Sequence, residues 1–341
     1  MKPWFEQPGP DRESVLASRI LLSRNLGGIP FPPLLDAEGQ ENILNQARKS
    51  ILSQNSLLAG SFRFLRLSSL SELEAVALAE RGAVIPEFLG AEDGRGLFLS
   101  EDESQSVMVN GEDHFLLQVR SAGLSLREAY GRADRLDTIL DKSLHFAFDQ
   151  RLGYLTRNPA ILGTGMMVSM DLHLPALTET GAAMRISADL RPLGILLRSI
   201  SGLSVPICGS VYRLSNRMTL GITEQEAVTN LCGIAGQLIA QERAGRNKLI
   251  RDLSVQDMVG RSFGIFSSAR LLGYNEFLRL ASVVRFGIAA GFLKNIGLEK
   301  IDSLLMCAQP AGIALKAGHR LSGAEESAAR AKLVRNAFSG K

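Results

Sequence analysis

The hydrophobic pattern of this chain changes character near residue 223. Before that point, short apolar runs typical of strands are mixed with helical segments. Residues 107–109 and 115–119 are two such runs on either side of a polar turn, which predicts a pair of short strands. Residues 166–174 alternate well enough to predict another strand, which Pro175 ends. Two shorter strand candidates are residues 184–186 and 211–214.

Helical spacing dominates the rest of the chain. Thr223 followed by Glu226 is a capping-box pattern, so a long helix is expected to begin there and to reach about residue 253. Further helices are expected after it, separated by Gly273, Gly297 and Gly323. Before residue 223, one helix is expected over residues 126–148, with an apolar stripe of Leu136, Ile139, Leu140, Leu144 and Phe148.

Composition narrows the class of protein. The chain is 45% apolar and 21% charged, as in ordinary globular proteins, and its net charge of +3 is too small to indicate a nucleic-acid partner. No signal peptide is apparent, and no stretch reaches the roughly 18 uninterrupted apolar residues that a membrane span needs. The three cysteines stand in no metal-ligand spacing. We therefore expect a cytoplasmic protein without a nucleic-acid, membrane or protein-bound metal site.

Several segments together resemble a known enzyme family. They are Ser18-Arg19-Ile20, Asn110-Gly111-Glu112-Asp113-His114, the stretch from Gly153 to Gly165, and two tail segments, Gln241-Glu242-Arg243 and Gln309-Pro310-Ala311. They are similar to segments of the ATP:guanidino phosphotransferases, and the tail is typical of the bacterial protein-arginine kinases, a branch related to creatine and arginine kinases. With the hydrophobic pattern, the resemblance implies an α+β domain over residues 1–228, with an antiparallel sheet flanked by helices. An all-helical C-terminal domain over residues 229–341 follows.

Phosphoryl transfer to a guanidinium needs two kinds of charge. Arginines suit the phosphates, because their planar fork binds phosphate oxygens bidentately and stays charged. Carboxylates must orient the acceptor and remove a proton from a group whose pKa is above about 12. The resemblance implies several arginines on the phosphates of MgATP, together with two glutamates and a cysteine beside the acceptor.

Position by position, the resemblance assigns few of these groups to this chain. Arg19 stands at a phosphate-binding arginine, Ser18 and Ser169 at weaker nucleotide contacts, and Glu112 at the catalytic carboxylate. The changed positions are Leu21, Leu116 and Met167 for arginines, Gly111 for the first glutamate, Asn158 for the cysteine and, less securely, Gly82 for a histidine. A short segment with Pro206 replaces a loop that carries another arginine and the second glutamate.

The retained residues also fit structural roles. Glu112 and His114 lie on a turn between strands, where hydrogen bonding is as good an explanation as catalysis. Arg19 also fits a pair with a surface carboxylate. Gly163 and Gly165 fit a turn that needs the backbone freedom of glycine.

Charge loss decides the leading hypothesis. Four missing arginines, at about 1.5–3 kcal/mol for each charged hydrogen bond, remove roughly 6–12 kcal/mol of phosphate and transition-state binding. We therefore predict a catalytically inactive or strongly impaired homologue, a pseudokinase that needs no cofactor. It would act on protein partners, namely an active kinase copy, an adaptor or the protease machinery that such kinases serve.

Two other hypotheses stay open. The first is an active, MgATP-dependent protein-arginine kinase with Glu112 as base and Arg19 on the phosphates, in which Arg157, Arg213 or Arg217 compensates for the lost arginines. The second is a binder of another ligand, with an apolar wall of Leu116, Met166 and Met167.

The C-terminal tail carries the remnant of a second motif. The resemblance implies a phosphoarginine pocket with the pattern Arg-Asp-x-x-Arg-Ala, of which Arg330 and Ala331 remain, while Glu326 replaces the first arginine. We expect Arg330 and Arg335 on the solvated face of a terminal helix. Apolar residues from Phe263 to Leu272 predict either a homodimer contact of this domain or packing against the first domain.

Overall fold

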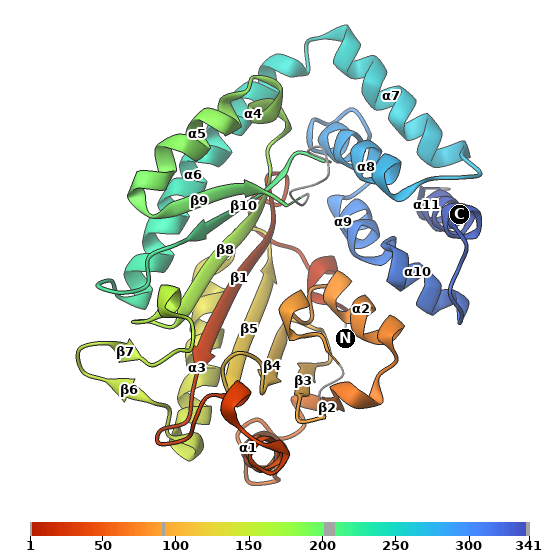
Figure 1. The fold of residues 1–341 in the computed structure, drawn as a ribbon. Coiled ribbons are helices and arrows are strands. Elements are labelled where there is room, and N and C mark those ends of the chain that lie inside the picture. The colour runs from red at the N-terminus through yellow and green to blue at the C-terminus, as the bar shows by residue number, and fades with distance from the viewer. Residues whose placement is uncertain (1, 91–92, 201–208, 339–341) are drawn as a thin grey trace.

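The computed structural model describes residues 2–90, 93–200 and 209–338. An antiparallel sheet of eight strands runs through the first part, in the order β2-β3-β4-β5-β1-β8-β10-β9 (Figure 1). Its strands are β1 (Val15–Arg24), β2 (Phe62–Arg66), β3 (Gly96–Ser100), β4 (Gln105–Val109), β5 (Phe115–Ala122), β8 (Met166–His173), β9 (Ile195–Ser199) and β10 (Val211–Asn216). A separate hairpin consists of β6 (Phe148–Asp149) and β7 (Gly153–Tyr154).

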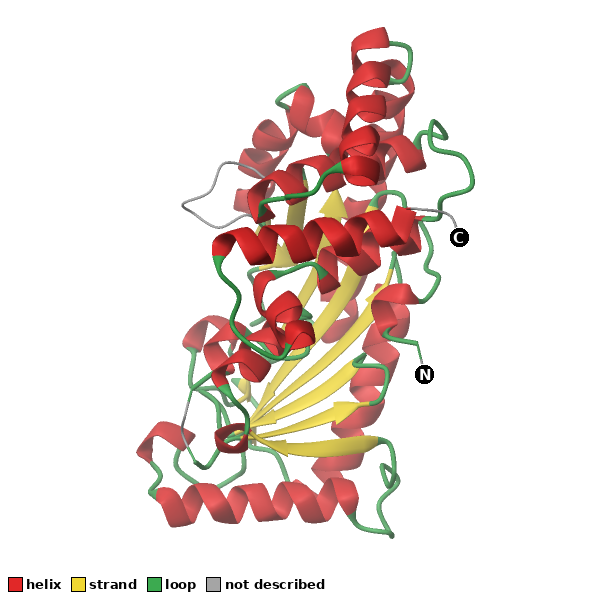
Figure 2. Cartoon of the chain, turned by 90° about the vertical axis from the view of Figure 1, so that its right-hand side faces the viewer, coloured by secondary structure: helices red, strands yellow, loops and turns green. Residues whose placement is uncertain are grey.

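Helices lie on both sides of the sheet (Figure 2). On one side the apolar positions of the strands, such as Ile20, Leu117 and Met170, form the main core with the helices α1 (Ala37–Leu52), α3 (Leu126–Leu144), α4 (Pro175–Glu179), α5 (Ala182–Leu190) and α6 (Glu224–Leu249). On the other side a smaller core under α2 (Glu72–Glu80) includes Leu78 and Leu99. The rest of this second face carries both polar and apolar side chains and holds the site described below.

The C-terminal helices have a core of their own. They are α7 (Leu253–Ser268), α8 (Tyr274–Ala289), α9 (Leu298–Cys307), α10 (Pro310–Ala317) and α11 (Gly323–Phe338), and Phe266, Phe277 and Val334 are buried among them. Helix α6 packs through Val228 and Leu231 against the sheet core, so it crosses the division proposed at residues 228 and 229. That division stays a prediction. Within the described ranges, no helix combines the length and apolar character that crossing a bilayer requires.

The structure confirms the fold class and most predicted elements. The strands expected at 107–109, 115–119, 166–174 and 211–214 are β4, β5, β8 and β10, and the Thr223 capping box begins α6. The strand expected at 184–186 is wrong, because these residues lie in α5. Ala183, Ile186 and Leu190 share one face at helical spacing and pack on the main core, a pattern that three alternating residues cannot reveal.

The helix expected to reach Phe148 ends four residues earlier. His145 adopts a left-handed backbone conformation with φ of 55° and closes α3, so Phe148 falls in strand β6. Its side chain is 62% exposed and meets the Tyr154 ring edge-on at 5.2 Å between ring centroids.

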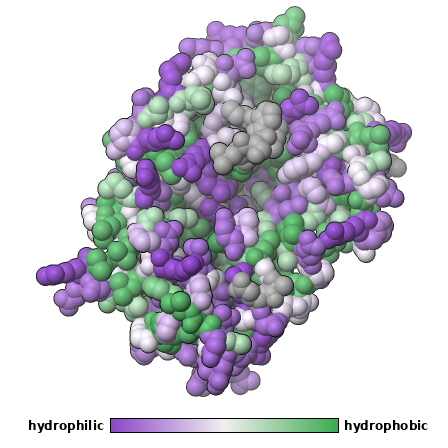
Figure 3. Space-filling view, in the orientation of Figure 1, coloured by the Kyte–Doolittle hydropathy of each residue, from purple (hydrophilic) through white to green (hydrophobic). Residues whose placement is uncertain are grey.

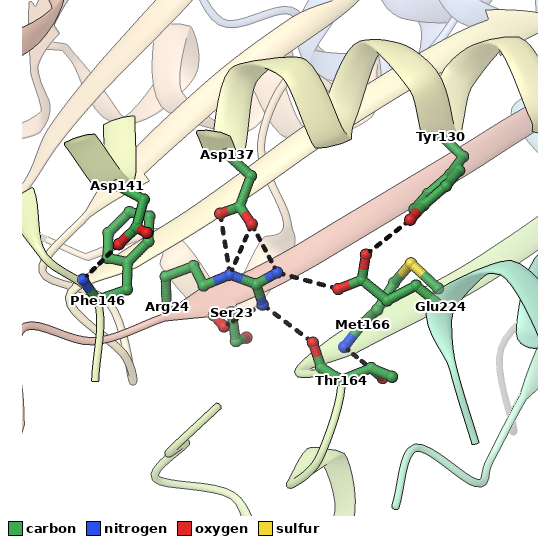
Figure 4. Close-up of polar contacts among 9 residues, drawn as sticks. All are labelled: Ser23, Arg24, Tyr130, Asp137, Asp141, Phe146, Thr164, Met166 and Glu224. Carbon is green, nitrogen blue, oxygen red and sulfur yellow. Dashed lines mark hydrogen bonds and ion pairs between the residues drawn. The ribbon is translucent and has the colours of Figure 1, made fainter. Parts of the chain in front are cut away.

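A buried arginine holds the central strand to two helices (Figure 4). Arg24, at the end of β1, donates from Nε and Nη2 to Asp137 of α3, with the shortest distances 2.9 Å, and from Nη2 to Glu224 of α6 at 3.1 Å. Nη1 donates to the carbonyl oxygens of Ser23 and Thr164, each at 3.0 Å. All five N–H donors therefore have acceptors, and the carboxylates raise the pKa of Arg24 although burial lowers it.

A second buried cluster joins the C-terminal helices to the sheet. Arg285 of α8 donates to Asp302 of α9 at 2.8 Å, to the Glu13 carbonyl at 3.0 Å and to Nδ1 of His173 at 3.1 Å. Because a guanidinium only donates, His173 is the neutral tautomer that carries its proton on Nε2, 2.8 Å from the hydroxyl of Ser282. Burial, and then the charge of Arg285, lower the pKa of His173 well below its ordinary value.

We expect Arg24→Met to lower the free energy of unfolding by about 3–5 kcal/mol, because it leaves the carboxylate of Asp137 buried without a counter-charge. Urea denaturation measures the change. Arg261→Met is the matched control, because Arg261 makes an exposed pair with Asp257 that is worth about 1 kcal/mol or less. Equal losses in the two variants would contradict this role of Arg24.

We also expect His173 to make stability fall in acid. Its folded pKa lies below the unfolded value of about 6.5, so the unfolded chain binds the proton first and stability decreases below pH 6.5, by up to about 1.4 kcal/mol per pH unit. His173→Asn keeps an acceptor for Arg285 and should flatten the dependence of urea unfolding between pH 7.5 and 5.5. His319→Asn, at an exposed histidine, is the control; parallel curves for all three proteins would rule this out.

Candidate functional site

Most of the predicted catalytic and nucleotide-binding positions meet in a cleft on this second face of the sheet. The cleft has a volume of about 440 Å³ and lies over β5, β1 and β8. Side chains reach it from every second residue of each strand, so Arg19, Leu21 and Ser23 of β1 share one face. Other lining residues are Phe88, Gly111, Glu112, Asp113, Leu116, Asn158, Met167 and Arg213.

The turn of residues 110–114 is held in place by its own buried members. Asn110 has a left-handed φ of 64°, and its side chain donates to the carbonyl oxygens of Gln40 and Gly94. Asp113 accepts hydrogen bonds from the side chain of Asn25 at 2.7 Å and the backbone of Arg157 at 2.8 Å. These bonds fix the direction in which Glu112 leaves the turn.

His114 has a structural role in this turn. Its Nδ1 accepts from the backbone N–H of Leu26 at 3.1 Å, so Nε2 carries the proton and donates to the carbonyl of Pro30 at 2.9 Å. Burial lowers the pKa of His114, in agreement with a neutral ring. Both nitrogens are occupied, which leaves Glu112 as the free polar side chain of the turn.

Glu112 stands at the mouth of the cleft. Its side chain is 64% exposed and has one charged neighbour, Arg157, at 3.4 Å between Nη1 and Oε1. An exposed pair at this distance is weak, about 1 kcal/mol or less. The carboxylate is therefore available to a ligand, and a guanidinium already lies beside it.

Two replaced positions now serve the local structure. A Cβ atom on Gly111 would lie 3.3 Å from the Phe88 ring, so a glutamate here needs that ring to move. Asn158 caps a short 3-10 helix by accepting from the backbone N–H of Ala160. The turn that follows this 3-10 helix needs its glycines, because Gly163 and Gly165 have φ of 104° and 60°.

The floor of the cleft is apolar where the resemblance expects positive charge. Leu21 lies opposite Met167 of β8 in the strand register, and Leu116 lies opposite Ser23 from β5. Met167 is 40% exposed toward the cleft, and the apolar side chains of Leu21, Leu116 and Met167 cannot donate a hydrogen bond to a phosphate oxygen. The described residues of the floor therefore fit a nucleotide triphosphate poorly. Pro206 lies outside the described residues.

Arg19 is the retained cation of the cleft. It is half-buried, and its Nε donates to the hydroxyl of Ser169 at 3.2 Å, so both predicted contacts of the nucleotide lie together. Burial, and then the charge of Arg213, lower the pKa of Arg19 to about 9. Ser18 points to the opposite side of the strand, where its hydroxyl donates to the Gly123 carbonyl and accepts from the Ser125 N–H. It does not reach the cleft.

The three arginines proposed to replace the lost phosphate contacts lie in different places. Arg157 pairs with Glu112, and Arg213 donates twice to Asp171, at 2.7 and 3.1 Å, while it lines the cleft. Arg217 is exposed and is not among the residues that line the cleft.

Sequence reasoning missed Asp171 and a further arginine, Arg120. Both lie on the face of Arg19, and counting every second residue from Leu116 and Met167 would have found them.

The prediction for the tail is wrong for Arg330, which is fully buried. It donates to the carbonyl oxygens of Ala308 at 2.8 Å and Leu272 at 3.1 Å and forms an ion pair with Glu326 on the same helix. Glu326 thus neutralises the guanidinium that the resemblance assigns to phosphoarginine. Arg335 is half-buried and donates to the carbonyl of Ala269. Sequence spacing alone did not show the burial of these two arginines, because their backbone acceptors come from other segments of the C-terminal domain.

Comparison with known proteins extends over the whole chain. A model of the ATP:guanido phosphotransferase C-terminal catalytic domain matches residues 42–245, and one of the protein-arginine kinase McsB C-terminal domain matches residues 252–341. The protein-arginine kinase of Caldanaerobacter subterraneus subsp. tengcongensis is 36% identical over 95% of this chain and 96% of its own length. That of Geobacillus kaustophilus is 37% identical over 97% of this chain and 92% of its own.

Solved structures show the same fold. Lombricine kinase has a TM-score of 0.61 at 22% identity, over 69% of this chain and 68% of its own. The duplicated taurocyamine kinase from Schistosoma mansoni with bound transition state analog components has a TM-score of 0.60 at 26% identity, over 67% of this chain and 33% of its own.

We expect Glu326→Ala to lower the free energy of unfolding by about 1.5–3 kcal/mol, the worth of a hydrogen bond to a charged group, because Arg330 then loses its counter-charge inside the domain. Urea denaturation tests this, with Lys332→Ala at an exposed position of the same helix as control. If both substitutions have the same small effect, Glu326 does not neutralise a buried charge.

Proposed function

Because this chain belongs to the ATP:guanido phosphotransferase family and is related along its length to the protein-arginine kinases, we propose that it is a kinase homologue with little or no phosphoryl transfer. It acts instead by binding protein partners of the protein-arginine phosphorylation system. The observation that carries this proposal is the apolar floor of the cleft, where Leu21, Leu116 and Met167 face the space that phosphates would occupy.

The size of the loss supports strong impairment. Charge around the phosphates is the main thing that an enzyme supplies in phosphoryl transfer. If only half of the roughly 6–12 kcal/mol from four arginines is lost, after allowance for non-additivity, the rate still falls by about a hundredfold or more. Arg157 and Arg213 do not replace these groups as they stand, because each is engaged with a carboxylate.

The partners that we propose are an active kinase copy, an adaptor or the associated protease machinery, all in the cytoplasm. A homodimer through the C-terminal helices belongs to the same proposal. It is supported by exposed apolar side chains on and next to α7, among them Met258, Ile265 and Leu271. Phe266 and Leu272 of the same region are buried within the C-terminal core instead.

An active, MgATP-dependent protein-arginine kinase is the second candidate. The names of the relatives favour it, since proteins 36–37% identical over nearly the whole chain are called protein-arginine kinases. Glu112 is exposed at the cleft and Arg19 lies in it, so a base and one phosphate contact remain. In this case Arg213 would have to leave Asp171 when phosphates bind.

An assay of phosphoarginine formation distinguishes the two candidate functions. With MgATP and an arginine-rich protein substrate, we expect phosphoarginine to form at least about a hundredfold more slowly than with the Geobacillus kaustophilus relative under the same conditions. Glu112→Gln is the control, because a residual rate that it abolishes comes from this cleft. A rate within about tenfold of the relative, lost in Glu112→Gln, would overturn the proposal and establish the second candidate.

A further inference from the structure

A second cavity of about 480 Å³ adjoins the cleft, between the sheet and the C-terminal helices. Arg19 and Arg213 line both spaces, so the two are continuous. The side formed by the sheet adds Arg120 and Asp171, and α8 contributes Tyr274 and Asn275. In Figure 3, hydrophilic side chains gather near the middle of this face of the molecule.

The strand register concentrates positive charge in this cavity. Arg19 lies opposite Arg120 of β5, and Asp171 of β8 lies opposite Arg213 of β10. Two acidic residues also line the cavity, and both are engaged. Asp171 accepts two hydrogen bonds from Arg213, and the carboxylate of Glu80 accepts from the backbone N–H groups of Ala311 and Gly312. The carboxylate of Glu80 caps helix α10. Among the lining residues, Asp171 is therefore the one carboxylate left to balance three guanidinium groups.

Arg120 is the group that most needs a further partner. It is 5% exposed, its Nη1 donates to the Arg81 carbonyl at 3.3 Å, and its Nε has no acceptor among the described residues. The guanidinium stacks on Trp4 at 4.3 Å, which supplies only a weak cation–π attraction. Asp171 attracts this guanidinium electrostatically, but the hydrogen bonds of Asp171 go to Arg213, and a buried cation with so little compensation is unfavourable. Burial lowers the pKa of Arg120 to about 10, because the attraction of Asp171 offsets it only in part.

Shape also distinguishes this cavity from a purine site. A Cβ atom on Gly82 would lie 1.4 Å from Nη1 of Arg120, so the guanidinium occupies the space where the resemblance expects a nucleotide-contacting histidine. Arg120 therefore blocks that position, while most of the other lining residues are apolar. The volume admits a small anion with its water or a short organic group.

We propose that this cavity binds a small phosphorylated anion, a pyrophosphate or phosphomonoester rather than an adenine nucleotide, through Arg19 and Arg120, and through Arg213 when the anion displaces Asp171 from it. Phosphate oxygens accept bidentate hydrogen bonds from arginine and would supply the missing counter-charge. Since Tyr274 and Asn275 form the opposite wall, the ligand bridges the sheet and the C-terminal helices. The site shares Arg19 and Arg213 with the neighbouring cleft, but binding here does not require that the cleft transfer phosphate.

Calorimetric titration of the full chain with pyrophosphate, inorganic phosphate and MgATP tests the site. We expect pyrophosphate to bind, and Arg120→Gln to weaken it by about 10- to 100-fold, the worth of one charged hydrogen bond. Asp171→Asn should tighten binding, because it removes the competing carboxylate; a folding defect cannot produce that gain. Arg261→Gln on α7 removes one exposed charge and should leave the affinity unchanged.

Three outcomes would overturn the proposal. The first is that pyrophosphate and phosphate at millimolar concentration produce no heat. The second is that Arg261→Gln weakens binding as much as Arg120→Gln, which means general charge attraction. Binding of MgATP without binding of pyrophosphate would show that the adenosine is recognised. Each outcome concerns binding at Arg120, so it is distinguishable from the phosphoarginine assay at Glu112.

Discussion

The buried arginine at the end of β1 is the interaction on which the rest of the structure depends. Arg24 joins the central strand to α3 through Asp137 and to α6 through Glu224, and Tyr154 of the β6–β7 hairpin stacks on it at 3.4 Å. A buried charge of this kind is tolerated only when every partner is in place. It therefore holds the first turn of α6 against the sheet, and α6 carries the chain from the sheet to the C-terminal helices.

Once β1 is fixed, the alternation of its side chains decides what each face of the sheet does. Ile20 and Leu22 enter the main core, while Arg19, Leu21 and Ser23 face the cleft. Relatives of this chain are named protein-arginine kinases, yet the buried positive charge of this face, at Arg19, Arg120 and Arg213, also lines the cavity toward the C-terminal helices. Arg19 and Leu21 are two residues apart on β1, which corresponds to about 7 Å. This spacing separates the apolar floor of the cleft from the cationic cavity.

The buried arginines of the C-terminal helices are also compensated by nearby acceptors. Arg285 is satisfied by Asp302, His173 and a carbonyl of the N-terminal segment, and Arg330 by Glu326 and two carbonyls. Both arginines are buried, and both hold segments that are far apart in the chain. The cavity that contains Arg120 differs because its cations exceed the carboxylates that face it.

The sequence by itself determined most of the local elements and the family. The hairpin around residues 110–114 and the Thr223 capping box depend on neighbours a few residues apart, so their patterns were readable. Only the tertiary structure decided which polar residues have partners. Ser18 and Arg19 are adjacent in sequence but face opposite sides, Arg330 is buried by other helices, and Arg120 meets Arg19 from another strand. Burial and counter-charge come from distant segments, which local spacing cannot specify.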